Sequence, residues 1–295
     1  MHARESSRKE EMWSVSSLLS WATADLKKRG DESARLDAEL MLGMTLGLDR
    51  VQLILQHERP LSAQELQHFK QLFVRRRNGE PMAYILGHRE FYGFDLRVDS
   101  RVLIPRPDTE TLVEVALERT RSREMYGRAL DLCTGSGCVA LALGLTRRTW
   151  RVTGVDLSKE ALCVARENAL RLGAAHNVHF VQGDLFASLA PQARYELIVA
   201  NPPYIPSADI ATLARDIRDF EPHLALDGGP DGCALLRRLV DGARRHLVAG
   251  GVFACEVGAG QSHDVQALLE HAGFEQIERA QDYGGHERVV SGIAP

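Results

Sequence analysis

From Arg128 onward, short apolar segments with strand character alternate with segments of helical character, and this alternation constrains the fold more than any other feature. Regular strand–helix alternation is typical of a mostly parallel sheet with helices on both faces. We therefore predict an α/β fold with a doubly wound sheet. The five predicted strands are Ala129 to Leu132, Val152 to Val155, Val178 to Val181, Leu197 to Ala200 and Val252 to Cys255.

The chain before this alternation has a different pattern, with helical spacing and few strand signals. Ser62 and Glu65 form an S-x-x-E capping pattern, which predicts a helix that begins there and runs toward Arg77. Another helix is predicted from about Asp31. Glycines, aromatic residues and an apolar alternation then predict a strand-rich connector. We expect three parts: a helical bundle over 1–85, the connector over 86–105 and the α/β domain over 106–295.

Charge and hydropathy limit the classes of partner. The formal charge of -4 gives no general attraction to the phosphates of nucleic acid, so we expect no direct nucleic-acid contact. The best local basic patch, Lys70 with residues 75–77, is typical of a solvated or helix-capping run. No apolar run approaches the roughly 20 residues that span a bilayer, and the first dozen residues lack the apolar core of a signal peptide. We expect a cytoplasmic protein with no membrane contact.

The five cysteines are scattered along the chain and show no paired CxxC spacing. This pattern indicates neither a zinc site nor a disulfide framework, and we expect no metal. Cys133 lies in a glycine-rich turn, but no histidine is near it in the sequence, so we assign it no nucleophilic role.

A glycine turn follows the first predicted strand and leads directly into an apolar helix. It runs from Asp131 through Gly135 and Gly137 to Ala140. Glycines allow a tight turn and close approach of a ligand to the backbone, whereas a Cβ at either position would push the ligand away. The turn therefore predicts a nucleotide-like ligand above it.

Two cofactors fit this turn. Gly135, Gly137 and Ala140 satisfy the dinucleotide pattern G-x-G-x-x-A, so a nicotinamide-dependent oxidoreductase is a competing hypothesis. Asp131, at the end of the strand, would repel a pyrophosphate but attract the ammonium and sulfonium region of S-adenosylmethionine. The charge therefore favours S-adenosylmethionine.

Two more acids follow the next strands. Asp156 lies about twenty residues beyond the glycines, where a carboxylate can accept hydrogen bonds from both ribose hydroxyls; its alternative role is at the start of the helix that Ser158 caps. Asp184 could accept a hydrogen bond from an adenine amino group while Leu185 or Phe186 covers the ring. A solvated turn is the alternative for Asp184.

The fourth strand ends in Asn201-Pro202-Pro203-Tyr204, the most specific signal in the chain. Asn201 offers a side-chain oxygen and Pro202 a carbonyl, so both N–H donors of an amide-like nitrogen can be held. The prolines stiffen the turn, and Tyr204 supplies a flat face beside a planar group. Because an amide nitrogen is a poor nucleophile, catalysis must come from orientation and electrostatics. We predict that Asn201, Pro202 and Tyr204 catalyse methylation of such a nitrogen, in a planar amide or a base.

With these motifs in this order, nearly the whole chain resembles the peptide chain release factor glutamine methyltransferases, the HemK or PrmC family. The resemblance implies a Rossmann-like class I methyltransferase domain, an N-terminal bundle that docks the substrate and a β-hairpin linker. It implies methyl transfer from S-adenosylmethionine to the glutamine of the Gly-Gly-Gln motif in class 1 release factors, with S-adenosylhomocysteine as product. We expect the enzyme to be a monomer.

The resemblance also implies roles for individual residues. The glutamine would be bound by Asn201, Pro202, Pro203 and Tyr204. Leu185 departs from the bulky aromatic residue that some relatives have there, which weakens its expected stacking role. The implied cofactor contacts are Cys133, Thr134, Gly135, Ser136, Gly137, Asp156, Leu185 and Asn201.

Two further stretches, 104–110 and 221–232, look more like the release-factor enzymes than the ribosomal protein L3 glutamine methyltransferases. The L3 enzymes and the nucleic-acid adenine N6-methyltransferases, which share the NPPY signature, are the alternatives among methyltransferases. Outside the methyltransferases, a further alternative is a noncatalytic module that docks a translation factor. Arg106 lies in the first stretch, where it could pair with a carboxylate of a ligand or be solvated.

Overall fold

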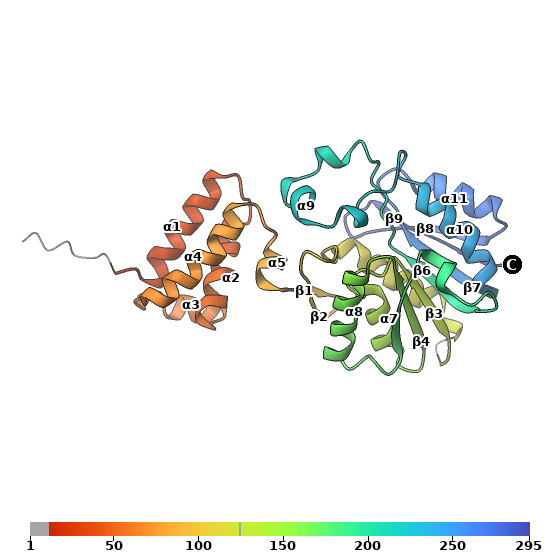
Figure 1. Cartoon of the computed structure of the whole chain (residues 1–295), viewed down its shortest axis with the longest axis horizontal. Coiled ribbons are helices and arrows are strands. Elements are labelled where there is room, and N and C mark those ends of the chain that lie inside the picture. The colour runs from red at the N-terminus through yellow and green to blue at the C-terminus, as the bar shows by residue number, and fades with distance from the viewer. Residues whose placement is uncertain (1–11, 124) are drawn as a thin grey trace, which may run out of the picture. The chain divides into compact units, whose positions relative to one another are not determined.

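The computed structural model describes residues 12–123 and 125–295 (Figure 1). The charged segment 1–11, which carried part of the argument against a signal peptide, lies outside these residues. The chain divides into two compact units, Met1–Leu86 and Gly87–Pro295. Among the described residues, no helix has the length and apolar character required to cross a bilayer.

The described residues of the first unit form helices around their own apolar core, which includes Met41 and Phe69. The predicted capping pattern is present, because Ser62 and Glu65 exchange side-chain and backbone hydrogen bonds at the start of α4. The helix predicted from Asp31 begins slightly later, after Ser33. The helices are α1 (Val15–Lys28), α2 (Ala34–Leu46), α3 (Arg50–Leu55), α4 (Ala63–Arg77) and α5 (Met82–Leu86).

The basic run at the end of α4 is neutralised within this unit. Arg76 lies 2.6 Å from Asp37 and 2.7 Å from Asp31, both mostly buried. The flanking arginines pair likewise, Arg75 with Glu80 and Arg77 with Asp25. This pairing favours a structural role for the run over a nucleic-acid docking site.

The second unit begins with an antiparallel hairpin of β1 (His88–Phe91) and β2 (Phe94–Arg97). Tyr92 and Gly93 between the strands both have positive φ, 52° and 76°, as a two-residue hairpin turn of type I′ requires. The hairpin therefore lies where the strand-rich connector was expected, and it groups with the second unit.

A seven-stranded sheet follows, in the order β5-β4-β3-β6-β7-β9-β8. All five predicted strands are present and parallel, which confirms the doubly wound α/β fold. The antiparallel strands β8 and β9 were not predicted; β8 is largely exposed and has too few apolar residues to show a strand pattern. The strands are β3 (Arg128–Leu132), β4 (Arg151–Asp156), β5 (Val178–Gln182), β6 (Tyr195–Ala200), β7 (Leu247–Glu256), β8 (Glu275–Gln281) and β9 (Glu287–Ile293).

Helices cover both faces of this sheet (Figure 1). The α-helices are α6 (Glu110–Arg119), α7 (Cys138–Thr146), α8 (Lys159–Arg171), α9 (Arg215–Phe220), α10 (Ala234–His246) and α11 (Ser262–His271). Short 3₁₀ helices occupy Pro107–Thr109, Arg121–Arg123, Leu185–Ser188, Ile210–Thr212 and His223–Ala225.

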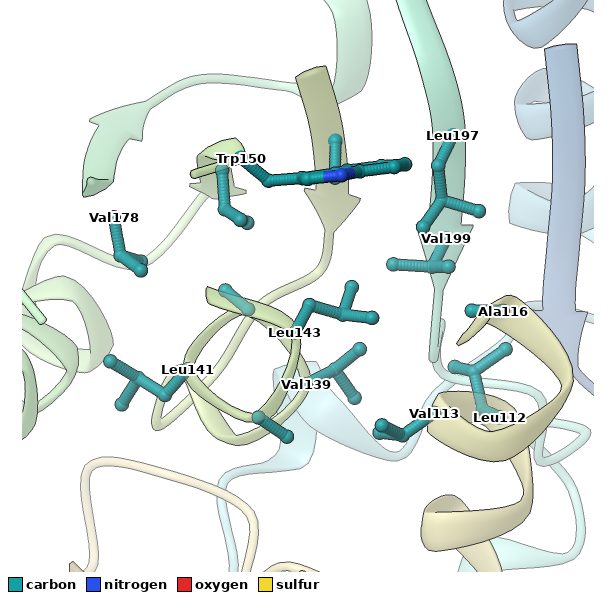
Figure 2. Packing of buried hydrophobic residues seen from close by; sticks show 14 of the residues in the cluster. Leu112, Val113, Ala116, Val139, Leu141, Leu143, Trp150, Val178, Leu197 and Val199 are labelled. Carbon is teal, nitrogen blue, oxygen red and sulfur yellow. The ribbon is translucent and has the colours of Figure 1, made fainter. Parts of the chain in front are cut away.

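Successive residues of each central strand pack into opposite cores, as the pleat of a sheet requires. Val199 belongs to the core beneath α6 and α7, and its neighbours Ile198 and Ala200 belong to the core beneath α10 and α11. Figure 2 shows Val139 and Leu143 of α7 directed toward Val199. With both faces buried, the open edge at the strands' carboxyl ends is where a ligand can reach the sheet.

Candidate active site

A cavity of about 200 Å³ lies at the carboxyl ends of the parallel strands. Its wall combines the turn after β3, the ends of β4 and β6, the turn after β5 and the segments 101–109 and 222–225. The predicted site residues that line it are Asp131, Cys133, Thr134, Gly135, Ser136, Asp156, Asp184, Leu185, Asn201 and Pro203. Gly137, Pro202 and Tyr204 are not part of the lining.

Asp131 is buried at the end of β3, with 1% of its surface exposed. One carboxyl oxygen, Oδ2, accepts hydrogen bonds from the Thr134 hydroxyl at 2.5 Å and from the backbone N–H of Ala140 at 3.1 Å. Burial, helped by the charge of Asp156, raises the pKa of Asp131 to about 7, although the hydrogen bonds from Thr134 and Ala140 lower it. A cation in the cavity would therefore stabilise the ionised form.

The two glycines of the turn have different roles. Both have positive φ, 54° at Gly135 and 81° at Gly137. A Cβ on Gly135 would meet no atom within 4 Å, whereas a Cβ on Gly137 would lie 3.0 Å from the ring of Phe180 and 3.2 Å from Ala165. Only Gly135 fits the expectation that a Cβ would push a ligand away; for Gly137 this reason was wrong, because protein atoms fill that space.

Asp156, at the end of β4, is held by backbone donors on both sides. Its Oδ2 accepts from the N–H of Gly135 at 2.8 Å and its Oδ1 from the N–H of Ser158 at 2.9 Å. Burial raises its pKa. Asp156 thus binds the backbone at the start of α8, as the alternative hypothesis predicted. Its side chain also faces the cavity, where a ribose hydroxyl could reach it.

The turn after β5 presents Leu185 to the cavity, while Phe186 points away and stacks on His246 with ring centroids 5.2 Å apart. Leu185 and Cys133 both have left-handed backbone, with φ of 50° and 60°. Such strain in non-glycine residues is concentrated at functional sites. Asp184 also lines the cavity, but its carboxylate is half exposed and accepts a hydrogen bond from Arg238 at 2.7 Å.

Asn201 lines the cavity directly after β6. Its side-chain nitrogen, Nδ2, donates to the hydroxyl oxygen of Thr109 at 3.1 Å. Thr109 is buried and also lines the cavity. An amide whose N–H₂ is engaged in this way keeps its oxygen available as an acceptor.

Tyr204 has a different surrounding from the one expected. Its hydroxyl donates to Oε1 of Glu256 at 3.2 Å, and its backbone carbonyl accepts from Gln261 at 2.9 Å. Burial and the charge of Glu256 both raise the pKa of Tyr204. The turn is also packed against Gly228, where a Cβ would lie 2.7 Å from the Cα of Tyr204. Tyr204 therefore anchors the turn to the protein instead of presenting its ring to the cavity.

The charges around the cavity discriminate between cofactors. Its two lining arginines are already paired, Arg101 with Asp99 at 2.6 Å and Arg106 with Glu221 at 2.5 Å. Asp131 and Asp156 have no ion-pair partner among the described residues. This surplus of negative charge suits the cationic S-adenosylmethionine and opposes the pyrophosphate of a nicotinamide cofactor.

Sequence reasoning assigned no role to Thr109, Glu221 or Glu256. The first two lie in stretches singled out as distinctive, but their partners are far away in sequence. Glu256 ends an apolar strand as Asp156 does, and Asp131 lies one residue before the end of another; this shared position was the available signal.

Comparison with known proteins adds to this geometry. Residues 17–87 match the family model of the PrmC N-terminal domain, and residues 108–230 match that of the methyltransferase small domain. Release factor glutamine methyltransferases from Geobacter sulfurreducens and Vibrio cholerae are each 43% identical to the chain, over 96% and 94% of its length and 98% and 96% of theirs. A methyltransferase structure from Pyrococcus furiosus has the same fold, with a TM-score of 0.52, 17% identity and coverage of 75% of this chain and 96% of that one.

Proposed function

The chain belongs to the release factor glutamine methyltransferase family, and we propose that it methylates the side-chain amide nitrogen of the glutamine in the Gly-Gly-Gln motif of class 1 release factors. When bound, S-adenosylmethionine would supply the methyl group from its positively charged sulfonium: the S–CH₃ bond breaks as the N–CH₃ bond forms, the nitrogen releases one proton to water, and S-adenosylhomocysteine is the other product. The observation that supports the reaction best is that one cavity is lined by both the amide of Asn201 and two acids, Asp131 and Asp156, that have no ion-pair partner among the described residues.

The residues that would hold the donor surround the turn after β3. Asp131 would attract its cationic end, and Gly135 leaves the open space into which the ligand can approach the backbone. Asp156 would accept hydrogen bonds from the ribose, while Leu185 would pack against the adenine and Asp184 would accept from its amino group. Cys133, Thr134, Ser136 and Gly137 would shape the turn that carries these contacts.

The residues that would hold the glutamine belong to the turn after β6. Asn201 Oδ1 and the carbonyl of Pro202 would each accept one N–H of the amide, which fixes the plane of the nitrogen. Pro203 would form part of the wall beside it, and Tyr204 would keep the turn in place through Glu256. No histidine or lysine lines the cavity among the described residues, so orientation of the amide is the main catalytic device that we assign.

We also propose that the enzyme acts in the cytoplasm as a monomer and that its helical unit docks the release factor. The ion pairs of residues 75–77 support a protein partner over direct contact with nucleic acid, because they leave that run without surplus charge.

Incubation with labelled S-adenosylmethionine tests this proposal. A class 1 release factor, ribosomal protein L3 and DNA would each be offered separately, and the modified atom would be located by mass spectrometry. We expect the label on the Gly-Gly-Gln glutamine only. Asn201→Ala should abolish turnover while calorimetry still detects binding of S-adenosylhomocysteine. Label on L3 or adenine, or none on the release factor, would refute the proposal.

A further inference from the structure

Asn168, on α8, is a polar residue of the core with no exposed surface. Both polar atoms of its side-chain amide are in use. Oδ1 accepts from the backbone N–H of Arg97 at 2.7 Å, and Nδ2 donates to the carbonyl of Arg97 at 3.1 Å and to that of Ser136 at 3.0 Å. One N–H and two carbonyls fit only one orientation of an amide, so the side chain cannot turn over without losing all three bonds.

The first partner, Arg97, ends β2 and leads into the cavity wall. Among the described residues β2 has a strand neighbour, β1, on one side only, and Asn168 engages the Arg97 peptide as a neighbouring strand would. An ion pair of Arg97 with Glu167 at 3.3 Å also joins β2 to α8, but both side chains are exposed, and such pairs contribute little. The buried amide therefore holds the start of the chain segment whose residues 101–109 line the cavity.

The second partner, the carbonyl of Ser136, belongs to the glycine turn before α7. In a regular helical turn this carbonyl would accept the N–H of Ala140, four residues later. That N–H donates to Asp131 instead, at 3.1 Å, and no backbone N–H of the described residues replaces it. Asn168 supplies the missing donor. Without it, the buried carbonyl would stay unpaired or compete with Asp131 for the N–H of Ala140.

We infer that Asn168 is a positioning residue for the donor site: its amide ties the glycine turn 133–137 to the cavity wall 101–109, so that both face one ligand. The inference rests on the proposed placement of S-adenosylmethionine at this turn. Asn168 is absent from the cavity lining, so it acts through the backbone and Asp131 and not by contact with the donor. Loss of the amide should weaken donor binding more than it changes the methyl-transfer step.

Asn177 provides a matched control at the opposite end of the sheet. It is also buried, and it lies directly before β5. Its Nδ2 donates to the carbonyls of Gly144 at 2.9 Å, Trp150 at 3.2 Å and Arg148 at 3.4 Å, near the end of α7 and the start of β4. Neither Asn177 nor these partners line the cavity. Replacing either asparagine thus removes bonds from a buried amide to backbone carbonyls, but only Asn168 adjoins the donor site.

The experiment compares alanine and aspartate variants of both asparagines in the full chain, by calorimetry with S-adenosylhomocysteine at a temperature where the variants are folded. Asn168→Asp keeps the shape and the acceptor but turns an oxygen toward two carbonyls. We expect both Asn168 variants to raise the Kd about 10-fold, the order that loss of a hydrogen bond to a buried carbonyl produces. Asn177→Ala and Asn177→Asp should leave the Kd unchanged. An unchanged Kd in the Asn168 variants, or an equal rise in the Asn177 variants, would overturn the inference.

Kinetics separate a positioning role from a loss of folded protein. In Asn168→Ala, the KM for S-adenosylmethionine should rise about 10-fold while kcat at saturating donor stays within about two-fold of wild type. A partly unfolded variant would show the reverse, a lower kcat at an unchanged KM, because its folded fraction binds the donor normally. That reverse pattern would overturn the inference. Failure of both Asn168 variants to fold while the Asn177 variants fold would do the same, because Asn168 would then hold the whole unit and not the donor turn.

Hydrogen exchange gives a readout that needs neither ligand nor release factor. In Asn168→Ala, the amide protons of Ala140 and of the turn 133–137 should exchange faster, and those around Trp150 should not. Asn177→Ala should show the converse. If wild-type protein methylates no release factor but binds S-adenosylhomocysteine more tightly than the Asn168 variants do, the proposed substrate is wrong and the role of Asn168 stands. If exchange in the turn does not respond to Asn168, that role is wrong whatever the substrate.

Discussion

Arg106 and Glu221, 115 residues apart in the sequence, form an ion pair in which Nη2 donates to Oε1 at 2.5 Å. The other oxygen of Glu221 accepts the backbone N–H of Ile104 at 3.1 Å. The carboxyl group is almost completely buried, and this burial raises its pKa, although the charge and hydrogen bond of Arg106 lower it. One side chain thus joins the two stretches that the sequence singled out, and both contribute to the cavity wall.

Glu221→Gln should destabilise the protein and loosen the cavity. The amide can still accept from Ile104, but the charge that Arg106 faces is gone. We expect the free energy of unfolding to fall by about 1 to 3 kcal/mol, the cost of losing a charged hydrogen bond that is only partly shielded from water, together with weaker binding of S-adenosylhomocysteine. Denaturant unfolding and calorimetry measure the two effects. Asp219→Asn, which breaks an exposed ion pair with Arg218, is the control and should change neither; equal effects of both variants would contradict the prediction.

Local features of the sequence predicted one part of the site well. Asp131 and Asp156 lie at or next to the last residue of apolar strands, and parallel strands align their carboxyl ends, so the position of each acid follows from its own segment. The same reasoning placed Asn201 at the cavity, because its turn ends the neighbouring strand. These predictions needed only strand boundaries and the rule of parallel alignment.

Other parts depend on contacts that no local pattern contains. Thr109 meets Asn201 across 92 positions of sequence, and the direction of the Tyr204 hydroxyl is decided by Glu256, 52 positions away. Gly137 was interpreted from its motif, but its missing Cβ makes room for Phe180, a residue of a different strand. Side-chain partners of this kind are fixed by tertiary packing, which a single sequence does not display.

Asp156→Asn should weaken binding of the donor product. The carboxylate accepts one backbone N–H on each oxygen, and an amide can replace only one of these acceptors. We expect the Kd for S-adenosylhomocysteine to rise about 10- to 100-fold, which corresponds to one or two lost charge-assisted hydrogen bonds. Asp241→Asn, on the exposed face of α10, is the control. An unchanged Kd in Asp156→Asn would remove Asp156 from the proposed donor site.

The stability of the protein should depend on pH through Asp131. Its pKa is raised from 3.8 to about 7 in the folded state, so the unfolded chain releases this proton at lower pH than the folded protein does. The contribution of protonated Asp131 to the free energy of unfolding is complete below about pH 4 and is lost as the pH rises through about 7. Asp131→Asn lacks this titration and can keep both hydrogen bonds to the single oxygen. As the pH rises from about 4.5 to about 7.5, between the pKa values of the unfolded and folded states, we expect the Tm of the variant to rise relative to that of wild type. A constant difference in Tm across this pH series would show that Asp131 does not titrate there.

Replacing each of the two turn glycines by alanine should separate an effect on stability from an effect on binding of the donor. Gly137→Ala places a Cβ against Phe180 and Ala165 at a backbone angle that alanine disfavours, so we expect a loss of about 2 to 4 kcal/mol of stability, from steric overlap added to left-handed strain. Gly135→Ala meets no protein atom and should lose only about 1 to 2 kcal/mol from the strain, but its methyl group enters the space proposed for the donor. At a temperature where both variants are folded, calorimetry should therefore show much weaker binding of S-adenosylhomocysteine to Gly135→Ala than to Gly137→Ala. The reverse order would mean that the donor approaches the turn from the side of Gly137, where Phe180 would have to move to admit it.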